Sequence, residues 1–212
     1  MVGCGGESSD SVESTPKQVA DADAVAALKR LGAKITINEQ GEVVEVDLAQ
    51  YRRSLLGHPE SLADVLLNPE NTLNRQREIL EVDSLKKRVT DADLVHLEWL
   101  TNLQTLILSG TNVTDAVLED LKDLTNLRGL YLDNTLVTDA GLMHLTELTG
   151  LQELGLGQTQ ITDAGLVNLK RLTNLRNLSL DFTKVSDAGL IHLKELTKLE
   201  ILSLFHTQIT DA

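Results

Sequence analysis

The sequence contains little of several residue types on which common classes of protein depend. Its single cysteine, Cys4, excludes an internal disulfide framework and a zinc cluster built from cysteines. Aromatic residues make up only 2% of the chain, so any core must consist mainly of aliphatic side chains. No apolar run reaches the roughly 18 to 20 residues that a membrane-spanning helix needs.

Positive charge is also scarce. The chain has 19 Lys and Arg residues against 32 Asp and Glu residues, which gives a formal net charge of -13. This charge repels phosphate backbones and anionic lipid headgroups, so it argues against a nucleic-acid partner.

What the sequence does contain is a repeat with a period of 24 residues. The aligned segments are TNLQTLILSGTNVTDAVL (101–118), TNLRGLYLDNTLVTDAGL (125–142), TGLQELGLGQTQITDAGL (149–166) and TNLRNLSLDFTKVSDAGL (173–190). Four positions are leucine in every copy, one is always threonine and one is always valine or isoleucine. These columns begin at Leu100, Leu103, Leu106, Leu108, Thr111 and Val113.

These residues resemble the leucine-rich repeat family, whose signature L-x-x-L-x-L-x-x-N/C-x-L appears four full times and once truncated between residues 100 and 212. The length of 24 residues and the phrase TDAGLxxL look most similar to bacterial GALA-like repeats and to the cysteine-containing repeats of eukaryotic ubiquitin-ligase adaptors. One departure is that threonine stands where the family usually has asparagine or cysteine. The resemblance implies an α/β fold, a right-handed solenoid with short parallel strands on its concave face and helices on its convex face.

The residue pattern leads to the same fold without the family. Leu178 and Leu180 alternate with polar residues, as in a short strand with one buried face. From Ser186 onward the leucine spacing is helical, and Ser186 or Asp187 can cap that helix. One such unit buries too little to be stable alone, so the units must stack. We expect the threonine hydroxyls to bind turn amides after each strand.

The region before the regular repeats is predicted in three parts. Residues 1–16 read as a disordered tail or a lipoprotein tether, residues 17–75 as an N-terminal cap, and residues 76–212 as the repeats, the last one truncated. The cap is expected to contain a helix at 23–32 ended by Gly32, a hairpin around 39–41 and an inserted helix at 59–67. A degenerate repeat is expected to follow, with Ile79 and Val82 in the strand columns and 89–97 as its helical half.

The start of the chain resembles the end of a bacterial lipoprotein signal, in which Cys4 would be the lipidated residue. This interpretation requires a start codon upstream of Met1 and would place the protein at the cell envelope. The alternative is a frayed tail with an ordinary thiol, in a cytoplasmic protein. A lipid on Cys4 is the only predicted link to a membrane.

Candidate binding residues lie at the outward positions of the predicted strands, where the sequence varies while the leucine columns do not. Tyr131 and Phe205 are expected on that face, with Phe182 at its border, as anchors for a protein partner. Asp133, Glu153 and Asp181 add an acidic strip that favours a basic partner. The alternative for Phe182 and Phe205 is that they pack against neighbouring side chains or against a missing C-terminal layer.

Catalysis and metal binding are not predicted. His96, His144 and His192 share a column at every second repeat, which separates them by roughly 10 Å, too far for one zinc ion. Trp99 is expected to pack against the upstream insertion. No nucleophile, base and orienting group can be nominated, and no cofactor site is expected.

The sequence therefore predicts a non-catalytic protein-binding scaffold. Two alternatives remain open. The segment HPESLADVLL (58–67) faintly resembles the opening of an F-box, which would make the chain a substrate-binding adaptor of a ubiquitin ligase. Alternatively, the chain is part of a larger repeat protein, because the layer of Leu199, Leu202 and Leu204 is expected to lack a cover.

Overall fold

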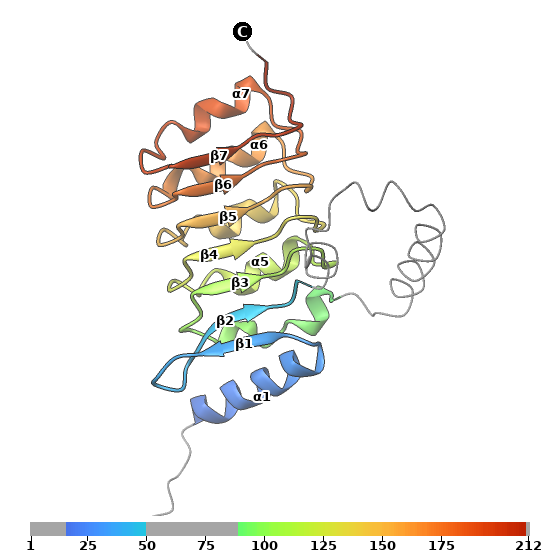
Figure 1. Ribbon diagram of the computed structural model, residues 1–212, viewed down its shortest axis with the longest axis vertical. Coiled ribbons are helices and arrows are strands. Elements are labelled where there is room, and N and C mark those ends of the chain that lie inside the picture. Colours follow the sequence, from blue (N-terminus) through green and yellow to red (C-terminus); the bar gives the residue numbers. More distant parts are fainter. Residues whose placement is uncertain (1–15, 50–88, 211–212) are drawn as a thin grey trace, which may run out of the picture.

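The computed structural model describes residues 16–49 and 89–210, which form one continuous stack of coils (Figure 1). A sheet of seven strands runs along the stack in sequence order. The first two strands pair antiparallel and all later neighbours pair parallel. The strands are β1 (Lys34–Ile37), β2 (Val43–Asp47), β3 (Thr105–Ile107), β4 (Gly129–Tyr131), β5 (Glu153–Gly155), β6 (Asn177–Ser179) and β7 (Ile201–Ser203).

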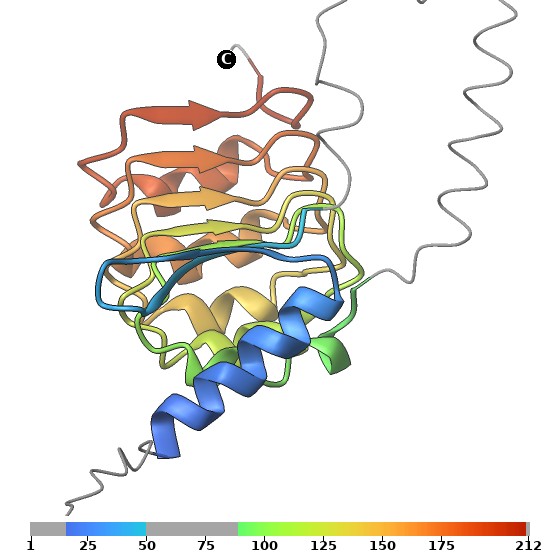
Figure 2. The same ribbon diagram turned by 60° about the horizontal axis from the view of Figure 1, so that its bottom comes forward.

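Each coil returns to the next strand through short helical segments on the opposite side of the sheet (Figure 2). They are η1 (Asp91–Asp93), η2 (Leu97–Trp99), α5 (Asp115–Leu121), η3 (Gly141–Leu145), α6 (Asp163–Leu166), η4 (Val167–Arg171), α7 (Asp187–Leu190) and η5 (Ile191–Leu193). The α-helical part is 7 residues long in α5 and only 4 in α6 and α7. The sequence explains the difference, because α5 has Val117 where the later coils have Gly165 and Gly189, and glycine lowers helix propensity.

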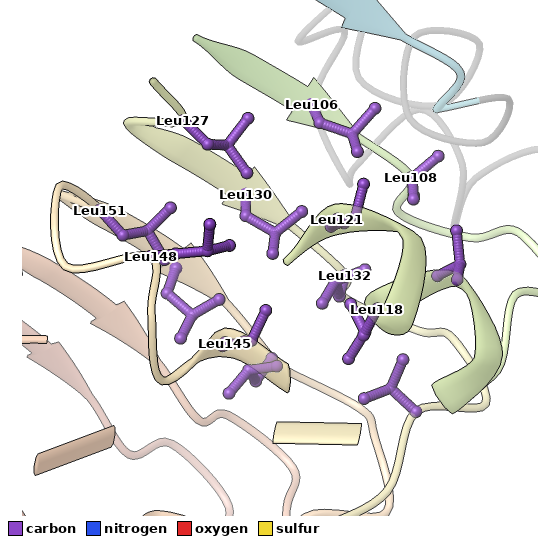
Figure 3. Packing of buried hydrophobic residues seen from close by; sticks show 14 of the residues in the cluster. Leu106, Leu108, Leu118, Leu121, Leu127, Leu130, Leu132, Leu145, Leu148 and Leu151 are labelled. Carbon is purple, nitrogen blue, oxygen red and sulfur yellow. The ribbon is translucent and has the colours of Figure 1, made fainter. Parts of the chain in front are cut away.

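Strand register agrees with the predicted columns from β3 onward. Leu106, Leu130, Leu154, Leu178 and Leu202 are register partners in consecutive strands. The first four point into the core between sheet and helices, where leucines of each coil contact those of the next (Figure 3). The fold class predicted from the sequence, an α/β solenoid of this kind, is confirmed.

The first coil differs from the prediction. Val46 of β2 is the register partner of Leu106, so β2 and β3 are direct neighbours. No strand lies between them in the sheet. Ile79 and Val82, which were expected in the strand columns of a degenerate repeat, lie outside the described residues. β2 is thus the strand of the coil that returns through η1 and η2, and the insertion falls between β2 and η1. Its residues, 50–88, lie outside the described part of the chain.

The N-terminal end of the stack is covered by α1 (Pro16–Arg30), which lies across it (Figure 2). Ala24 and Leu28 of this helix are buried in the core. The helix begins earlier than the predicted residue 23, and it ends as predicted near Gly32, whose φ is +84°. The N–H groups of Gly32 and Ala33 donate to the carbonyls of Lys29 and Leu28, both at 3.0 Å, the pairing of a Schellman motif.

The predicted hairpin is present between β1 and β2. Asn38 Oδ1 accepts hydrogen bonds from the N–H groups of Gln40 at 3.0 Å and Glu42 at 2.9 Å, and Gly41 has φ +81°. The division of the chain at residues 16 and 75 stays a prediction, since both boundaries adjoin residues outside the described ranges.

The C-terminal end of the stack is open within the described residues. Leu202 is 36% exposed, whereas Leu154 in the same column is 2% exposed. Leu199 and Leu204 are half-buried, and Ile201 is exposed.

The threonine hydroxyls bind a different partner from the one predicted. Each hydroxyl donates to the carbonyl oxygen three residues earlier, at the end of its own strand, so the bonds lie within a coil and do not reach turn amides. The donors are Thr111, Thr135, Thr159, Thr183 and Thr207, at 2.5 to 2.7 Å. The carbonyls of Leu108, Leu180 and Leu204 also accept the backbone N–H of the same threonine, so the hydroxyl adds a second hydrogen bond within the turn.

A second polar column joins neighbouring coils. The aspartate at the start of each return segment accepts both the N–H and the hydroxyl hydrogen bond of the Thr or Ser one coil later. The pairs are Asp91–Thr114, Asp115–Thr138, Asp139–Thr162, Asp163–Ser186 and Asp187–Thr210. We call this series the aspartate ladder. The sequence predicted these residues only as helix caps, a role that Thr114 and Thr162 also perform.

Candidate protein-binding face

The outward side chains of the strands line a recess of about 650 Å³ on the strand face. It extends from β2 to the turn after β6, so side chains far apart in the sequence meet there. Its lining includes Glu45, Asp47, Ile107, Tyr131, Asp133, Asp181 and Phe182. No Lys or Arg is among the lining residues that the structure describes. The recess is therefore acidic, with apolar side chains between its carboxylates.

Glycines make room for Asp133 in this recess. A Cβ atom at Gly155 would lie 2.3 Å from Asp133 Oδ2, so a larger residue there would displace the carboxylate. Asp133 Oδ1 accepts a hydrogen bond from the Gly157 N–H at 2.9 Å, and Oδ2 accepts one from Ser109 Oγ at 3.4 Å. The position of Asp133 is thus fixed by coils on both sides.

Tyr131 is held down on the face and does not project from it. Its hydroxyl donates a hydrogen bond to the Glu153 carboxylate. Burial raises the pKa of the Tyr131 phenol, and the hydrogen bond to Glu153 and the negative charges of Glu153, Asp133 and Glu45 raise this pKa further. Tyr131 is therefore a neutral hydrogen-bond donor over the whole physiological range.

Asp181 also bonds to the following coil. Its Oδ1 accepts hydrogen bonds from Ser203 Oγ at 2.6 Å and from the Phe205 N–H at 2.7 Å. Of the predicted binding residues, Tyr131, Asp133 and Asp181 line the recess. Glu153 reaches it only through Tyr131, and Phe205 is not part of its lining.

Sequence reasoning missed Glu45 and Asp47, which contribute two further carboxylates. Both lie at outward positions of β2, which pairs in register with β3. Glu45 Oε2 accepts a hydrogen bond from Thr36 Oγ1 at 2.8 Å, and Asp47 Oδ1 accepts one from the Ala49 N–H at 2.9 Å. The alternation in VVEVD indicates that Glu45 and Asp47 face outward. Because this strand was assigned to a separate cap, both residues were left out of the predicted strand face.

Two phenylalanines on the face group with a histidine and not with Tyr131. Phe182, Phe205 and His206 contact each other, with ring centroids 5.8 Å apart for Phe182–Phe205, 4.7 Å for Phe182–His206 and 4.2 Å for Phe205–His206. We call them the aromatic patch. Tyr131 of β4 lies two strands from the turn of Phe182 and three strands from that of Phe205, roughly 10 and 14 Å by the spacing of a sheet. Tyr131 and Phe182 line the same recess, but their rings belong to different groups.

One backbone position of each turn has a left-handed conformation. Gly110, Asn134, Gln158, Phe182 and His206 have φ between +54° and +78°. Glycine and asparagine adopt this conformation readily, whereas a phenylalanine there is strained. Each of the first four residues donates its N–H to a carbonyl of the next coil, which fixes the turn.

The other residues singled out in the sequence do not assemble a site. Within the described ranges, no three His, Cys, Asp or Glu side chains are placed to share a metal ion. Trp99 stacks on His96 with centroids 4.8 Å apart and stays partly exposed. Three features of the sequence lie outside the described residues. They are Cys4, the segment 58–67 and the insertion that Trp99 was expected to cover. No helix of residues 16–49 and 89–210 has the length and apolar character of a membrane span.

Comparison with known proteins identifies the repeats. The family model described as Leucine Rich repeats (2 copies) matches residues 101–148. This part of the chain thus matches leucine-rich repeats. The same leucine columns continue beyond the matched residues, up to β7. Proteins built from such repeats generally act as protein-interaction scaffolds and typically lack enzymatic activity.

Solved structures with similar folds include an internalin, inlF, from Listeria monocytogenes, with 27% identity and a TM-score of 0.50 over 55% of this chain and 33% of that chain. An internalin C2 from the same organism has 23% identity and a TM-score of 0.39 over 60% and 79% of the two chains. The PEPR1–AtPEP1 complex has 18% identity and a TM-score of 0.48 over 82% and 20%. This chain thus spans about a third of the inlF chain. No curated protein sequence matches significantly.

Proposed function

We propose that this protein is a non-catalytic interaction scaffold whose strand face binds a cationic segment of a partner protein. The acidic recess is the observation that carries the proposal. Glu45, Asp47, Asp133 and Asp181 contribute carboxylates to one cavity, and Ile107 and Tyr131 provide apolar surface between them. A peptide with Lys or Arg side chains is the complement of such a surface, because the side chains combine a long apolar stem with a charged end.

The hydrogen bonds around the recess favour a preformed site. Asp133 and Asp181 are each fixed by backbone N–H groups of the next coil, and Asp47 by a backbone N–H of its own turn. Carboxylates that are already ordered lose little conformational entropy when a partner binds. The stacked strands beneath them make the face rigid.

Charge neutralisation in the recess tests the proposal. We expect the double variant Glu45→Gln, Asp47→Asn to bind a fluorescein-labelled oligo-arginine peptide about 5- to 30-fold more weakly than the wild type at low ionic strength. The estimate takes about 0.5 to 1 kcal/mol for each partly exposed charge, with about 1.4 kcal/mol per tenfold change. Both amides keep an acceptor for the hydrogen bonds to Thr36 and Ala49.

The matched control is Glu119→Gln, Asp123→Asn, which removes the same charge from two exposed residues of the helical side. It should change peptide affinity by less than about twofold, since screening weakens charges that lie far from the bound peptide. Equal weakening by the two double variants in fluorescence anisotropy would mean that only net charge matters, and the recess would lose its assigned role.

Three finer points belong to the proposal as well. The 24-residue length and the phrase TDAGL support a GALA-like subtype of leucine-rich repeat. The pattern of the sequence supports the domain division at residues 16 and 75. The short sequence around Cys4 supports a lipid anchor, and partition of the full-length gene product into a detergent phase tests it.

A further inference from the structure

The aromatic patch is the largest group of exposed rings in the described part of the chain, and the acidic recess does not account for it. Phe182 is 48% exposed and Phe205 is 64% exposed. Their edge-to-face contact orders the two rings but leaves both accessible to a partner. Packing within the described residues therefore does not explain two large apolar side chains at this position.

Phe182 is also kept in an unfavourable backbone conformation. Its φ is +57°, in the column where the coil of β3 has Gly110. A bulky residue pays a steric cost there that glycine avoids, and this cost is not offset by burial of the ring. Exposed aromatic residues held in strained conformations are a reason to look for a binding role.

The patch is continuous with the recess through Phe182. This residue lines the recess beside Asp181, and its ring contacts Phe205 and His206 beyond the end of the recess. A ligand that lies across the strands from Asp133 thus reaches the patch within three strand spacings, roughly 14 Å. About four to five residues of an extended chain cover that length.

We infer that the strand face recognises a bipartite segment, in which Lys or Arg residues bind the recess and an aromatic or large aliphatic residue binds the aromatic patch. The inference rests on the proposed function and adds the second half of the binding determinant. Charge complementarity selects the cationic part, and contact with Phe182 and Phe205 selects the apolar anchor. Apolar anchors of this kind dominate affinity in many interfaces, while exposed charges contribute more to association rate and specificity.

Selection from a phage-displayed random peptide library tests the inference without a known partner. Peptides selected on the wild-type chain should be enriched in Lys or Arg together with an aromatic or large aliphatic residue about four to five positions away, the extended-chain span given above. Selection on the variant Phe182→Gly, Phe205→Ser should retain the basic residues and lose the apolar preference. Selection on Glu45→Gln, Asp47→Asn should retain the apolar residue and lose the basic preference.

Gln158→Gly provides the matched control for Phe182→Gly. Both changes place glycine in the left-handed column, but Gln158→Gly removes an uncharged side chain that lines the recess, whereas Phe182→Gly removes a ring from the patch. A selected peptide, resynthesised and titrated by fluorescence anisotropy, should bind Phe182→Gly about tenfold more weakly or worse, in the range of an interface hot spot. It should bind Gln158→Gly clearly more tightly than Phe182→Gly. The salt dependence of binding should flatten only in the Glu45→Gln, Asp47→Asn variant.

The outcomes separate the inference from the proposed function. Basic peptides without an apolar preference, or equal binding to Phe182→Gly and Gln158→Gly, would overturn the bipartite site and leave the cationic recess standing. Peptides without basic residues would overturn both. Light scattering that shows a wild-type dimer converted to monomer by Phe205→Ser would identify the patch as an interface between two copies and would also overturn the inference.

Discussion

Replacing Asp139 by alanine is expected to lower the free energy of unfolding by about 2 to 4 kcal/mol. Asp139 Oδ1 accepts a hydrogen bond from the Thr162 N–H at 2.8 Å, and Oδ2 accepts one from the Thr162 hydroxyl at 2.6 Å. A hydrogen bond to a charged group contributes about 1.5 to 3 kcal/mol. Two such bonds would contribute about 3 to 6 kcal/mol, but both residues are half-buried, so water replaces part of the loss and the expected cost falls to about 2 to 4 kcal/mol.

The open end of the aspartate ladder supplies the control. Asp187 makes the same two bonds to Thr210, at 3.1 and 2.6 Å, but Thr210 is exposed and no coil covers it within the described residues. Asp187→Ala should therefore destabilise the chain much less than Asp139→Ala. Asp139→Asn should lie between the wild type and Asp139→Ala, since its amide oxygen can still accept from the Thr162 N–H.

Urea unfolding followed by circular dichroism measures these differences as shifts of the midpoint at constant slope. If Asp139→Ala costs no more than Asp187→Ala, the ladder does not hold neighbouring coils together. A decreased slope would instead indicate that the stack unfolds in separate parts, which repeat proteins can do when an interface between coils weakens.

Other predictions concern single columns of the repeat. In a Tyr51→Phe background, the Tyr131 phenol should stay protonated above its usual pKa of about 10 while the protein is folded. Because folding raises this pKa, the associated stability is present below about pH 10 and is lost as the pH rises. Ionisation at an ordinary pKa in an absorbance titration would contradict the contact with Glu153. Gln158→Gly should raise the unfolding free energy by up to about 1 kcal/mol, because it relieves a left-handed φ of +57°. Asn134→Gly should change the unfolding free energy less. Thermal unfolding that ranks the two variants in the opposite order would count against backbone strain at this turn position. Leu154→Ala should lower the free energy of unfolding by about 2 to 5 kcal/mol, and Leu202→Ala should lower it clearly less. The reason is that Leu154 is buried between two coils, whereas Leu202 is covered on one side only. Equal urea midpoints for the two variants would show that the end layer is covered in solution.

The regular coils could be predicted from the sequence because burial restricts their columns. Leu106, Leu130 and Leu154 occupy positions that only a large aliphatic residue fills, so aligning the repeats also gave the strand register. The first coil could not be predicted in the same way. Val46 and Val82 both fit the strand column, and only the pairing of β2 with β3, which links residues 60 positions apart, decides between them.

The face was predictable in its composition and less so in its grouping. Alternation along each strand placed Tyr131, Asp133 and Asp181 on the outward side, where the structure has them. The partner of each side chain depends on the neighbouring coil, however. The bond from Tyr131 to Glu153 and the separation of Tyr131 from Phe205 follow from strand spacing and rotamers, which no single coil encodes. The left-handed conformation of Phe182 is indicated only by Gly110 and Asn134 at the same repeat position, since phenylalanine itself disfavours it.

The aspartate ladder also restricts how the length of this protein can change. Each carboxylate pairs with a donor 23 positions further along the chain, so every bond joins two successive coils. Removal or duplication of one whole 24-residue unit between β3 and β7 would leave each aspartate facing an equivalent threonine or serine. A deletion of any other size would put a different residue opposite the carboxylate and shift the leucines out of register. Whole units are therefore the natural step for engineering shorter or longer versions of this scaffold.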